Sequence, residues 1–178
     1  MSLKLYIGCM FSGKTSKLIE EYENIISQNK IPIVINFQND NRYGNDNYVY
    51  SHDLKKIPCI KAEKLLSLDE NIFLNCDYIL INEGQFFVDI LEFCTLWSDK
   101  HKKNIIVCGL NGDYLRKPFQ EISNLISICD QNIKLNALCV KCDYKQEALF
   151  TKRITNDKER IVIGTNNYIP VCRKHYLE

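Results

Sequence analysis

The sequence GCMFSGKT at residues 8–15 matches the phosphate-binding pattern G-x-x-x-x-G-K-[ST]. It follows an apolar, strand-like run at residues 5–7 and precedes a segment with helical periodicity. In this setting the backbone N–H groups of the loop can point at a polyphosphate, and the following helix adds the positive end of its dipole. We therefore predict that the whole loop binds a nucleotide through its phosphates: Gly8, Cys9, Met10, Phe11, Ser12, Gly13, Lys14 and Thr15.

Two side chains of this loop have further expected roles. Lys14 would reach the β and γ phosphates, and the Thr15 hydroxyl would occupy one coordination position of Mg²⁺. A glycine-rich turn without a ligand is the alternative. At average residue frequencies the pattern arises by chance in roughly one chain of this length in a couple of hundred. Its place between a strand and a helix disfavours the alternative further.

Cysteine spacing points to a metal near the C-terminus. Two residues separate Cys139 from Cys142 and Cys172 from His175, which is a spacing found in tetrahedral zinc sites. Four ligands leave no open position, so we expect the zinc to be structural. The other cysteines are scattered, several of them inside apolar runs, and we expect them to be small core residues. They are Cys9, Cys59, Cys76, Cys94, Cys108 and Cys129.

Composition limits the class of protein. A chain of 178 residues with 46% apolar and 25% charged residues can bury one substantial core. The net charge of +1 gives no broad basic field for a polynucleotide, so nucleotides are the expected partners. No apolar run approaches the roughly 20 residues that span a bilayer, and no signal-peptide pattern is present. We expect a cytoplasmic protein without a membrane partner.

The phosphate-binding loop needs a scaffold of alternating strands and helices to position it. Helical spacing follows the loop over residues 18–26, a buried strand is expected at 31–37, and the polar residues 38–53 are expected to form a long loop. Apolar runs at 78–81 and 104–109 predict two more buried strands, with a helical pattern at 89–101 between them. This order predicts an α/β fold with a three-layer P-loop core built on a parallel sheet, and a ligand site at the carboxyl ends of its strands.

The pattern changes near residue 138. Short β-like pieces at 148–154 and 160–163 lie between the two pairs of metal ligands, and a polar loop follows at 164–170. We therefore predict a nucleotide-binding core over residues 1–137 and a small zinc-bound β subdomain over residues 138–178.

Together these motifs resemble the type II thymidine kinases. The resemblance is carried, in order along the chain, by GCMFSGKT, INEGQFF at 81–87, RKPF at 116–119, CVKC at 139–142, TKR at 151–153 and VCRKH at 171–175. It implies a homotetrameric, zinc-containing kinase that moves the γ-phosphoryl of ATP, with Mg²⁺, to the 5′-hydroxyl of thymidine. The product would be dTMP for DNA synthesis, and the end product dTTP would inhibit the kinase.

The resemblance also implies roles for individual residues. Glu83 matches the carboxylate that accepts the proton of the 5′-hydroxyl, and a carboxylate leaving a central strand beside a phosphate loop suits that role. A structural ion pair is the alternative for Glu83. Arg42 matches a basic residue that lies against the transferring phosphates, for which a solvated loop charge is the alternative. The pair His52 and Asp53 also matches, with no role beyond loop structure.

A further set of residues would surround the base and sugar of the nucleoside. On sequence alone its apolar and aromatic members are typical of a core. The loop at 164–170 corresponds to the family's lasso, which holds thymine largely through main-chain hydrogen bonds, and zinc-pinned ends would give it the necessary stiffness. The nucleoside-binding residues implied by the resemblance are Met10, Phe86, Leu110, Tyr114, Phe119, Thr151, Val162, Ile163 and Tyr168.

Three positions depart from the family pattern. Cys9 replaces a usual proline, Asn111 replaces a frequent aspartate, and Asn82 replaces the acidic residue that helps to hold Mg²⁺. We expect Asn82 to stay associated with Mg²⁺, since a neutral amide can orient a metal-bound water, but it removes a negative charge. The alternative to an active kinase is therefore a catalytically weakened nucleotide-binding homologue. A zinc-ribbon nucleic-acid binder with an ATPase is disfavoured by the neutral pI of about 7.5.

Overall fold

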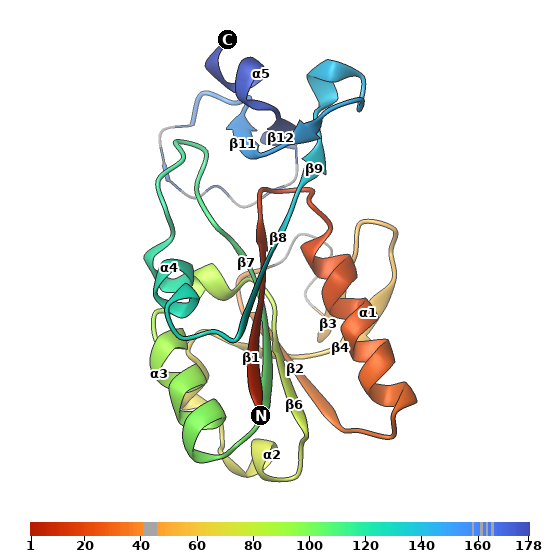
Figure 1. Cartoon of the computed structure of the whole chain (residues 1–178), viewed down its shortest axis with the longest axis vertical. Coiled ribbons are helices and arrows are strands. Elements are labelled where there is room, and N and C mark those ends of the chain that lie inside the picture. The colour runs from red at the N-terminus through yellow and green to blue at the C-terminus, as the bar shows by residue number, and fades with distance from the viewer. Residues whose placement is uncertain (41–45, 158, 161, 163, 165) are drawn as a thin grey trace.

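The computed structural model describes residues 1–40, 46–157, 159–160, 162, 164 and 166–178. At its centre is a six-stranded sheet in the order β5-β2-β6-β7-β1-β8, in which every neighbouring pair of strands is parallel (Figure 1). Apolar runs form these strands because a sheet covered on both faces needs apolar side chains on both. The strands are β1 (Ser2–Gly8), β2 (Pro32–Phe37), β5 (Ile60–Ala62), β6 (Tyr78–Ile81), β7 (Asn104–Leu110) and β8 (Gln131–Leu135).

Helices cover both faces of this sheet (Figure 1). One face packs against α1, which buries Leu18 and Ile19, and the other packs against α3, the π-helical turn η3 and α4, which enclose Trp97. Alternate residues of β1 enter the two cores, as Leu5 and Tyr6 do. The predicted three-layer α/β fold is confirmed. The helices are α1 (Lys14–Ser27), α2 (Asn71–Leu74), α3 (Ile90–Thr95), η3 (Leu96–Lys100), α4 (Gln120–Ile126) and α5 (Arg173–Leu177), with 3₁₀ turns η1 (Leu65–Ser67), η2 (Gly84–Phe86) and η4 (Val140–Cys142).

The polar segment at 38–53 was predicted to be a loop throughout, and this is wrong for residues 48–50. Residues Tyr48–Tyr50 form β3, which pairs antiparallel with β4 (Lys56–Pro58). The reason is a pair of apolar side chains, Val49 and Ile57, that the hairpin buries in the core beside α1. Polar neighbours hid this contact in the sequence.

The C-terminal part carries two small antiparallel sheets and α5 at one end of the molecule (Figure 1). The strands are β9 (Ala137–Leu138) with β10 (Glu147–Ala148), and β11 (Phe150–Arg153) with β12 (Tyr168–Val171). The prediction of a strand at 160–163 is wrong for its described residues, Arg160 and Val162. Instead β12 takes the end of the segment predicted as a loop, where Pro170 is tolerated because β12 has one sheet neighbour. The predicted boundary after residue 137 falls inside β9 and stays a prediction.

Candidate active site

The carboxyl ends of four central strands converge on one cavity of about 320 Å³. Strand register aligns Gly8 of β1 with Leu110 of β7, and Ile81 of β6 with Val107 of β7, so the segments after these strands meet at one edge. The volume is in the range of pockets that hold small organic ligands. Residues from the phosphate-binding loop, the segments after β2, β6 and β7, and the β11–β12 loop line this cavity.

The phosphate-binding loop joins β1 to α1 in the predicted strand–loop–helix order. Gly8 is required by close packing, because a Cβ there would lie 2.3 Å from the Leu135 carbonyl oxygen. Gly13 adopts a left-handed φ of 80° at the start of α1. Lys14 Nζ donates a 2.7 Å hydrogen bond to the Cys9 carbonyl, which curls its ammonium over the loop. The first turn of α1 thus opens into the cavity with a cation beside it.

The same loop is attached to the C-terminal sheets from behind. The Met10 backbone N–H donates to the Thr151 hydroxyl at 3.0 Å, and the Cys9 thiol donates to the Ala148 carbonyl at 3.4 Å. Burial raises the pKa of the Cys9 thiol, so it stays neutral near a phosphate site. Gly8 and Cys9 belong to the predicted phosphate set but support the loop from beneath, since neither lines the cavity.

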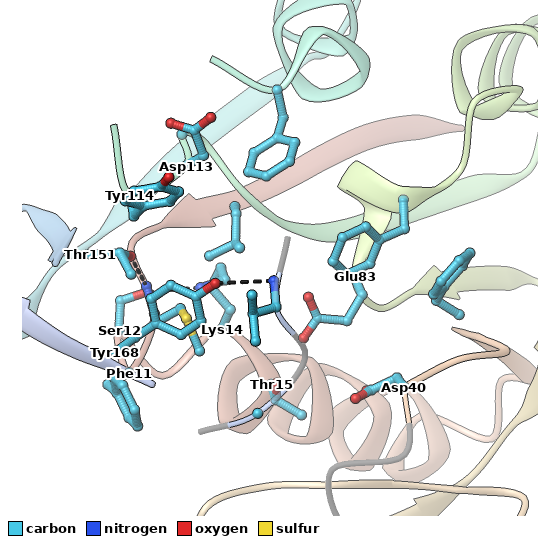
Figure 2. A pocket seen from close by; sticks show the side chains of 18 of the residues that line it. Phe11, Ser12, Lys14, Thr15, Asp40, Glu83, Asp113, Tyr114, Thr151 and Tyr168 are labelled. Carbon is cyan, nitrogen blue, oxygen red and sulfur yellow. Dashed lines mark hydrogen bonds between the residues drawn. The ribbon is translucent and has the colours of Figure 1, made fainter. Parts of the chain in front are cut away.

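Glu83 is a buried carboxylate in a strained backbone conformation at the cavity wall. It is 8% exposed, lines the cavity and has a φ of 54°. That left-handed conformation costs a residue with a side chain about 1–2 kcal/mol. Figure 2 shows its carboxylate pointing into the cavity, on the side where Thr15 and Asp40 also lie.

Gln85 orients that carboxylate, a contact the sequence did not predict. Its Nε2 donates to Glu83 Oε2 at 2.6 Å, and its Oε1 accepts the Leu110 N–H at 2.9 Å. Gln85 is 3% exposed, so the side-chain amide is fixed between two strand ends. The signal available in the sequence was a polar residue between Glu83 and two phenylalanines.

Asn82 lies behind the cavity wall. Its side chain is buried, and its Nδ2 donates to Asn36 Oδ1 at 3.0 Å. Asn36 in turn donates from Nδ2 to Asp40 Oδ2 at 3.2 Å. Asp40 lines the cavity, whereas Asn82 does not. A pair of buried amides therefore connects position 82 to a carboxylate that faces the cavity.

The described residues predicted to surround a nucleoside come together around this one cavity. Aromatic rings make contact there, with Phe86 5.0 Å from Phe37 and 6.5 Å from Phe119 between centroids. The Tyr168 hydroxyl accepts the Val162 N–H at 3.2 Å (Figure 2). Ile163 and Arg42 lie outside the described residues. The lining residues from the predicted set are Met10, Phe86, Leu110, Tyr114, Phe119, Thr151, Val162 and Tyr168.

His52, for which only a loop role was expected, also lines the cavity. Its ring stacks on Phe11 of the phosphate-binding loop, with centroids 5.3 Å apart and planes 20° from parallel. Phe11 adopts a φ of 63°, and its ring lies against His52 in the β3–β4 turn. This contact could not be predicted from the sequence, because it joins two segments far apart in the chain.

The predicted zinc ligands form a compact cluster. Their ligand atoms, three Sγ atoms and His175 Nδ1, all lie within 4.8 Å of one another. Cys142 and Cys172 Sγ are 3.8 Å apart, and the three sulfurs lie 3.3 to 3.5 Å from the nitrogen. Tetrahedral zinc with Zn–S of about 2.3 Å and Zn–N of about 2.0 Å requires ligand separations of about 3.5–3.8 Å. The donor set, Cys139, Cys142, Cys172 and His175, therefore fits a structural zinc.

Comparison with known proteins agrees with this geometry. The thymidine kinase family model matches residues 1–176. The chain belongs to the thymidine kinase family. It is 41% identical to the thymidine kinase of vaccinia virus strain Western Reserve, over 99% of this chain and 97% of the viral protein. It is 38% identical to thymidine kinase a of Arabidopsis thaliana, over 99% of this chain and 75% of the plant protein. Throughout the described residues, every helix is too short or too polar to cross a membrane.

Proposed function

We propose that this chain phosphorylates thymidine, moving the γ-phosphoryl of ATP to the 5′-hydroxyl to give dTMP. The observation that carries the proposal is one cavity that joins a phosphate-binding loop, an inward-pointing carboxylate and a wall of aromatic residues. Membership of the thymidine kinase family supports the choice of substrate.

Each part of the site has a separate task in this reaction. The loop and Lys14 bind the phosphates and offset their charge where it grows in the transition state. Glu83, oriented by Gln85, accepts the proton of the 5′-hydroxyl as that oxygen attacks phosphorus. Arg42 is proposed to lie against the transferring phosphates.

Magnesium would be held at the wall that carries Thr15 and Asp40. A hydroxyl and a carboxylate are the hard oxygen donors that this ion prefers, and both line the cavity. When bound, the ion neutralises charge on the β and γ phosphates. Asn82 is associated with the ion indirectly, since its amide and that of Asn36 orient Asp40.

The nucleoside would bind between the aromatic residues and the β11–β12 loop. Tyr114, Phe119 and Tyr168 offer ring surfaces, and the loop offers backbone groups that can read a base. Its ends are the paired strands β11 and β12, and β12 leads directly to Cys172 of the zinc cluster. Zinc therefore stiffens one end of the nucleoside site.

Three further properties complete the proposal, and the resemblance to type II thymidine kinases supports them. They are a homotetrameric assembly, inhibition by dTTP and a cytoplasmic location. Each of the nine cysteines lies in the described part of the chain without a disulfide partner, which is compatible with a reducing compartment.

The test is a coupled kinase assay with thymidine, deoxyuridine and deoxycytidine, each with and without Mg²⁺. Mg²⁺-dependent ADP release with thymidine supports the proposal. ATP and thymidine binding by calorimetry, without turnover at any Mg²⁺ concentration, would favour a catalytically weakened homologue. Turnover of another nucleoside but not thymidine would overturn the assignment of substrate.

A further inference from the structure

Arg160, in the β11–β12 loop, lines the cavity and contacts the segment after β7. Its Nε donates to Asp113 Oδ2 at 2.8 Å, and its Nη2 donates to the Pro118 carbonyl at 2.9 Å. The guanidinium carbon lies 4.8 Å from the centre of the Phe119 ring. One side chain thus makes an ion pair, a hydrogen bond and a cation–π contact with one short segment.

Asp113 is fixed in place by its own segment. Its side chain is 2% exposed, and its Oδ1 accepts the N–H groups of Leu115 at 3.0 Å and Lys117 at 2.8 Å. This turn holds the carboxylate with Oδ2 directed at Arg160. The anion is therefore already oriented for the arginine, whose own side chain is 50% exposed, so solvent partly screens the ion pair.

Arg153 tethers the backbone of the same part of the loop. Its Nη2 donates to the Arg160 carbonyl at 3.2 Å and to the Tyr168 hydroxyl at 2.6 Å. Its guanidinium carbon lies 3.7 Å from the ring centre of Tyr114, the neighbour of Asp113. Both the side chain and the backbone of Arg160 are thereby linked to residues 113–119.

These contacts lie at the part of the cavity that the proposed function gives to the nucleoside. Asp113, Phe119, Arg160 and Val162 all line it. In Figure 2, Asp113 and Tyr114 lie on the side away from Thr15 and Asp40. The ion pair consequently joins two walls of the nucleoside end and leaves the phosphate end untouched.

We propose that Asp113 and Arg160 form a latch that holds the β11–β12 loop closed at the nucleoside end of the cavity, so that Arg160 is a positioning residue for nucleoside binding. The inference rests on the proposed function. A loop that reads a base must be ordered when the base binds, and an intact latch orders it beforehand. ATP, which is held by the phosphate-binding loop, gains little from the latch.

Salt dependence gives a sharp test because thymidine carries no charge. The dissociation constants of thymidine and ATP are measured by calorimetry on the full chain at about 0.1 M and about 1 M NaCl, where the Debye length is about 10 Å and about 3 Å. For the wild type we expect thymidine binding to weaken about two- to threefold at high salt. Asp113→Asn keeps an oxygen for the turn but removes the charge, so this salt effect should disappear.

Three more variants separate the latch from simple destabilisation. Arg160→Gln should raise the thymidine Kd and KM about three- to tenfold, with kcat and ATP Kd within about twofold. Arg160→Lys keeps the charge but loses the two-point contact, so it should recover part of the affinity. Combining Asp113→Asn with Arg160→Gln should add little to either single change. Glu159→Gln, which changes an exposed charge beside the latch, is the matched control and should behave as the wild type.

Hydrogen exchange keeps the latch testable apart from the kinase activity. In the ligand-free protein, Asp113→Asn and Arg160→Gln should speed amide exchange at the described residues of the β11–β12 loop, among them Ile154, Asn166 and Asn167, but not in β1 or α1. If the wild type does not phosphorylate thymidine while this local effect appears, the proposed function fails and the latch stands. Unchanged exchange, an unchanged thymidine Kd, or equal losses for thymidine and ATP would overturn the latch.

Discussion

The backbone N–H of Met10 and the hydroxyl of Thr151 form a 3.0 Å hydrogen bond that joins the phosphate-binding loop to β11. Met10 lies between Gly8 and Gly13 of the phosphate-binding pattern, whereas Thr151 precedes the β11–β12 loop by three residues. Both residues line the cavity. One short contact therefore couples the loop proposed to bind phosphate to the strand that leads into the loop proposed to contact the nucleoside.

Thr151→Val tests this coupling. Valine keeps the shape and strand preference of threonine but leaves the Met10 N–H without its acceptor, which costs about 1–3 kcal/mol in a buried setting. We expect the KM values for ATP and thymidine to rise together, with a lower midpoint of urea unfolding. Thr151→Ser retains the hydroxyl and should stay near the wild type. A rise in the thymidine KM alone would show that the two parts are not coupled here.

Glu83→Gln tests the proton acceptor. The amide keeps the size of the side chain and its hydrogen-bonding ability but cannot take a proton, so turnover should fall by about 10² to 10⁴. Calorimetric Kd values for ATP and thymidine should change little. Near-normal turnover would move the base to another residue. Glu92→Gln, on α3 outside the cavity, is the control for the loss of one carboxylate.

Loss of zinc should weaken the binding of both substrates, and that of thymidine more than that of ATP. Cys172→Ala removes one ligand and loosens the end of β12. Cys9 of the β1–α1 loop packs in the same small core as Cys139 and Cys172, so ATP binding should also weaken. We expect zinc content to fall, the melting temperature to drop and the Kd for thymidine to rise well above the change for ATP. Metal analysis accompanies the binding measurements. Cys129→Ala, outside the ligand cluster, should leave the zinc content, the melting temperature and the thymidine Kd unchanged. Full zinc content in Cys172→Ala would contradict the ligand assignment.

Asp40→Asn tests the acidic wall of the metal site. Removing its charge should raise the Mg²⁺ concentration for half-maximal turnover about tenfold, which corresponds to about 1.4 kcal/mol. Mn²⁺ binding to the protein–ATP complex, followed by electron paramagnetic resonance, gives a readout independent of turnover. Asn82→Leu removes the amide that supports Asn36, so it should produce a smaller change in the same direction. Identical Mn²⁺ affinity in Asp40→Asn would place the carboxylate outside the metal's surroundings.

Much of the fold followed from apolar runs and their order. The strands at 78–81 and 104–110 were readable because a central parallel strand is apolar on both faces. The hairpin of β3 and β4 could not be predicted, since a single buried residue on each strand, Val49 and Ile57, gives no periodic signal. Likewise β12 is recognisable only through its pairing with β11, a contact between segments separated by the whole connecting loop.

The site shows the same division. Lys14 and the zinc ligands stand in short motifs whose spacing predicts phosphate or metal binding, so they could be proposed from the sequence alone. Glu83 was proposed from the family resemblance and from its place after a central strand. Residues that act through a distant partner could not. Gln85 can orient Glu83 because the Leu110 N–H holds its side-chain oxygen, and Asn82 faces Asn36 rather than the cavity. Such pairs depend on strand order, which no local pattern encodes.

The paired strands β11 and β12 have an evolutionary consequence. Their register places Arg153 opposite Tyr168, so the connecting loop leaves and re-enters the molecule at adjacent points. Insertions or deletions inside it need not move either strand, and doubling its length costs only about 0.6 kcal/mol in closure entropy. Substrate preference in such a chain can diverge through changes of loop length while Glu83 and the β1–α1 loop stay constant.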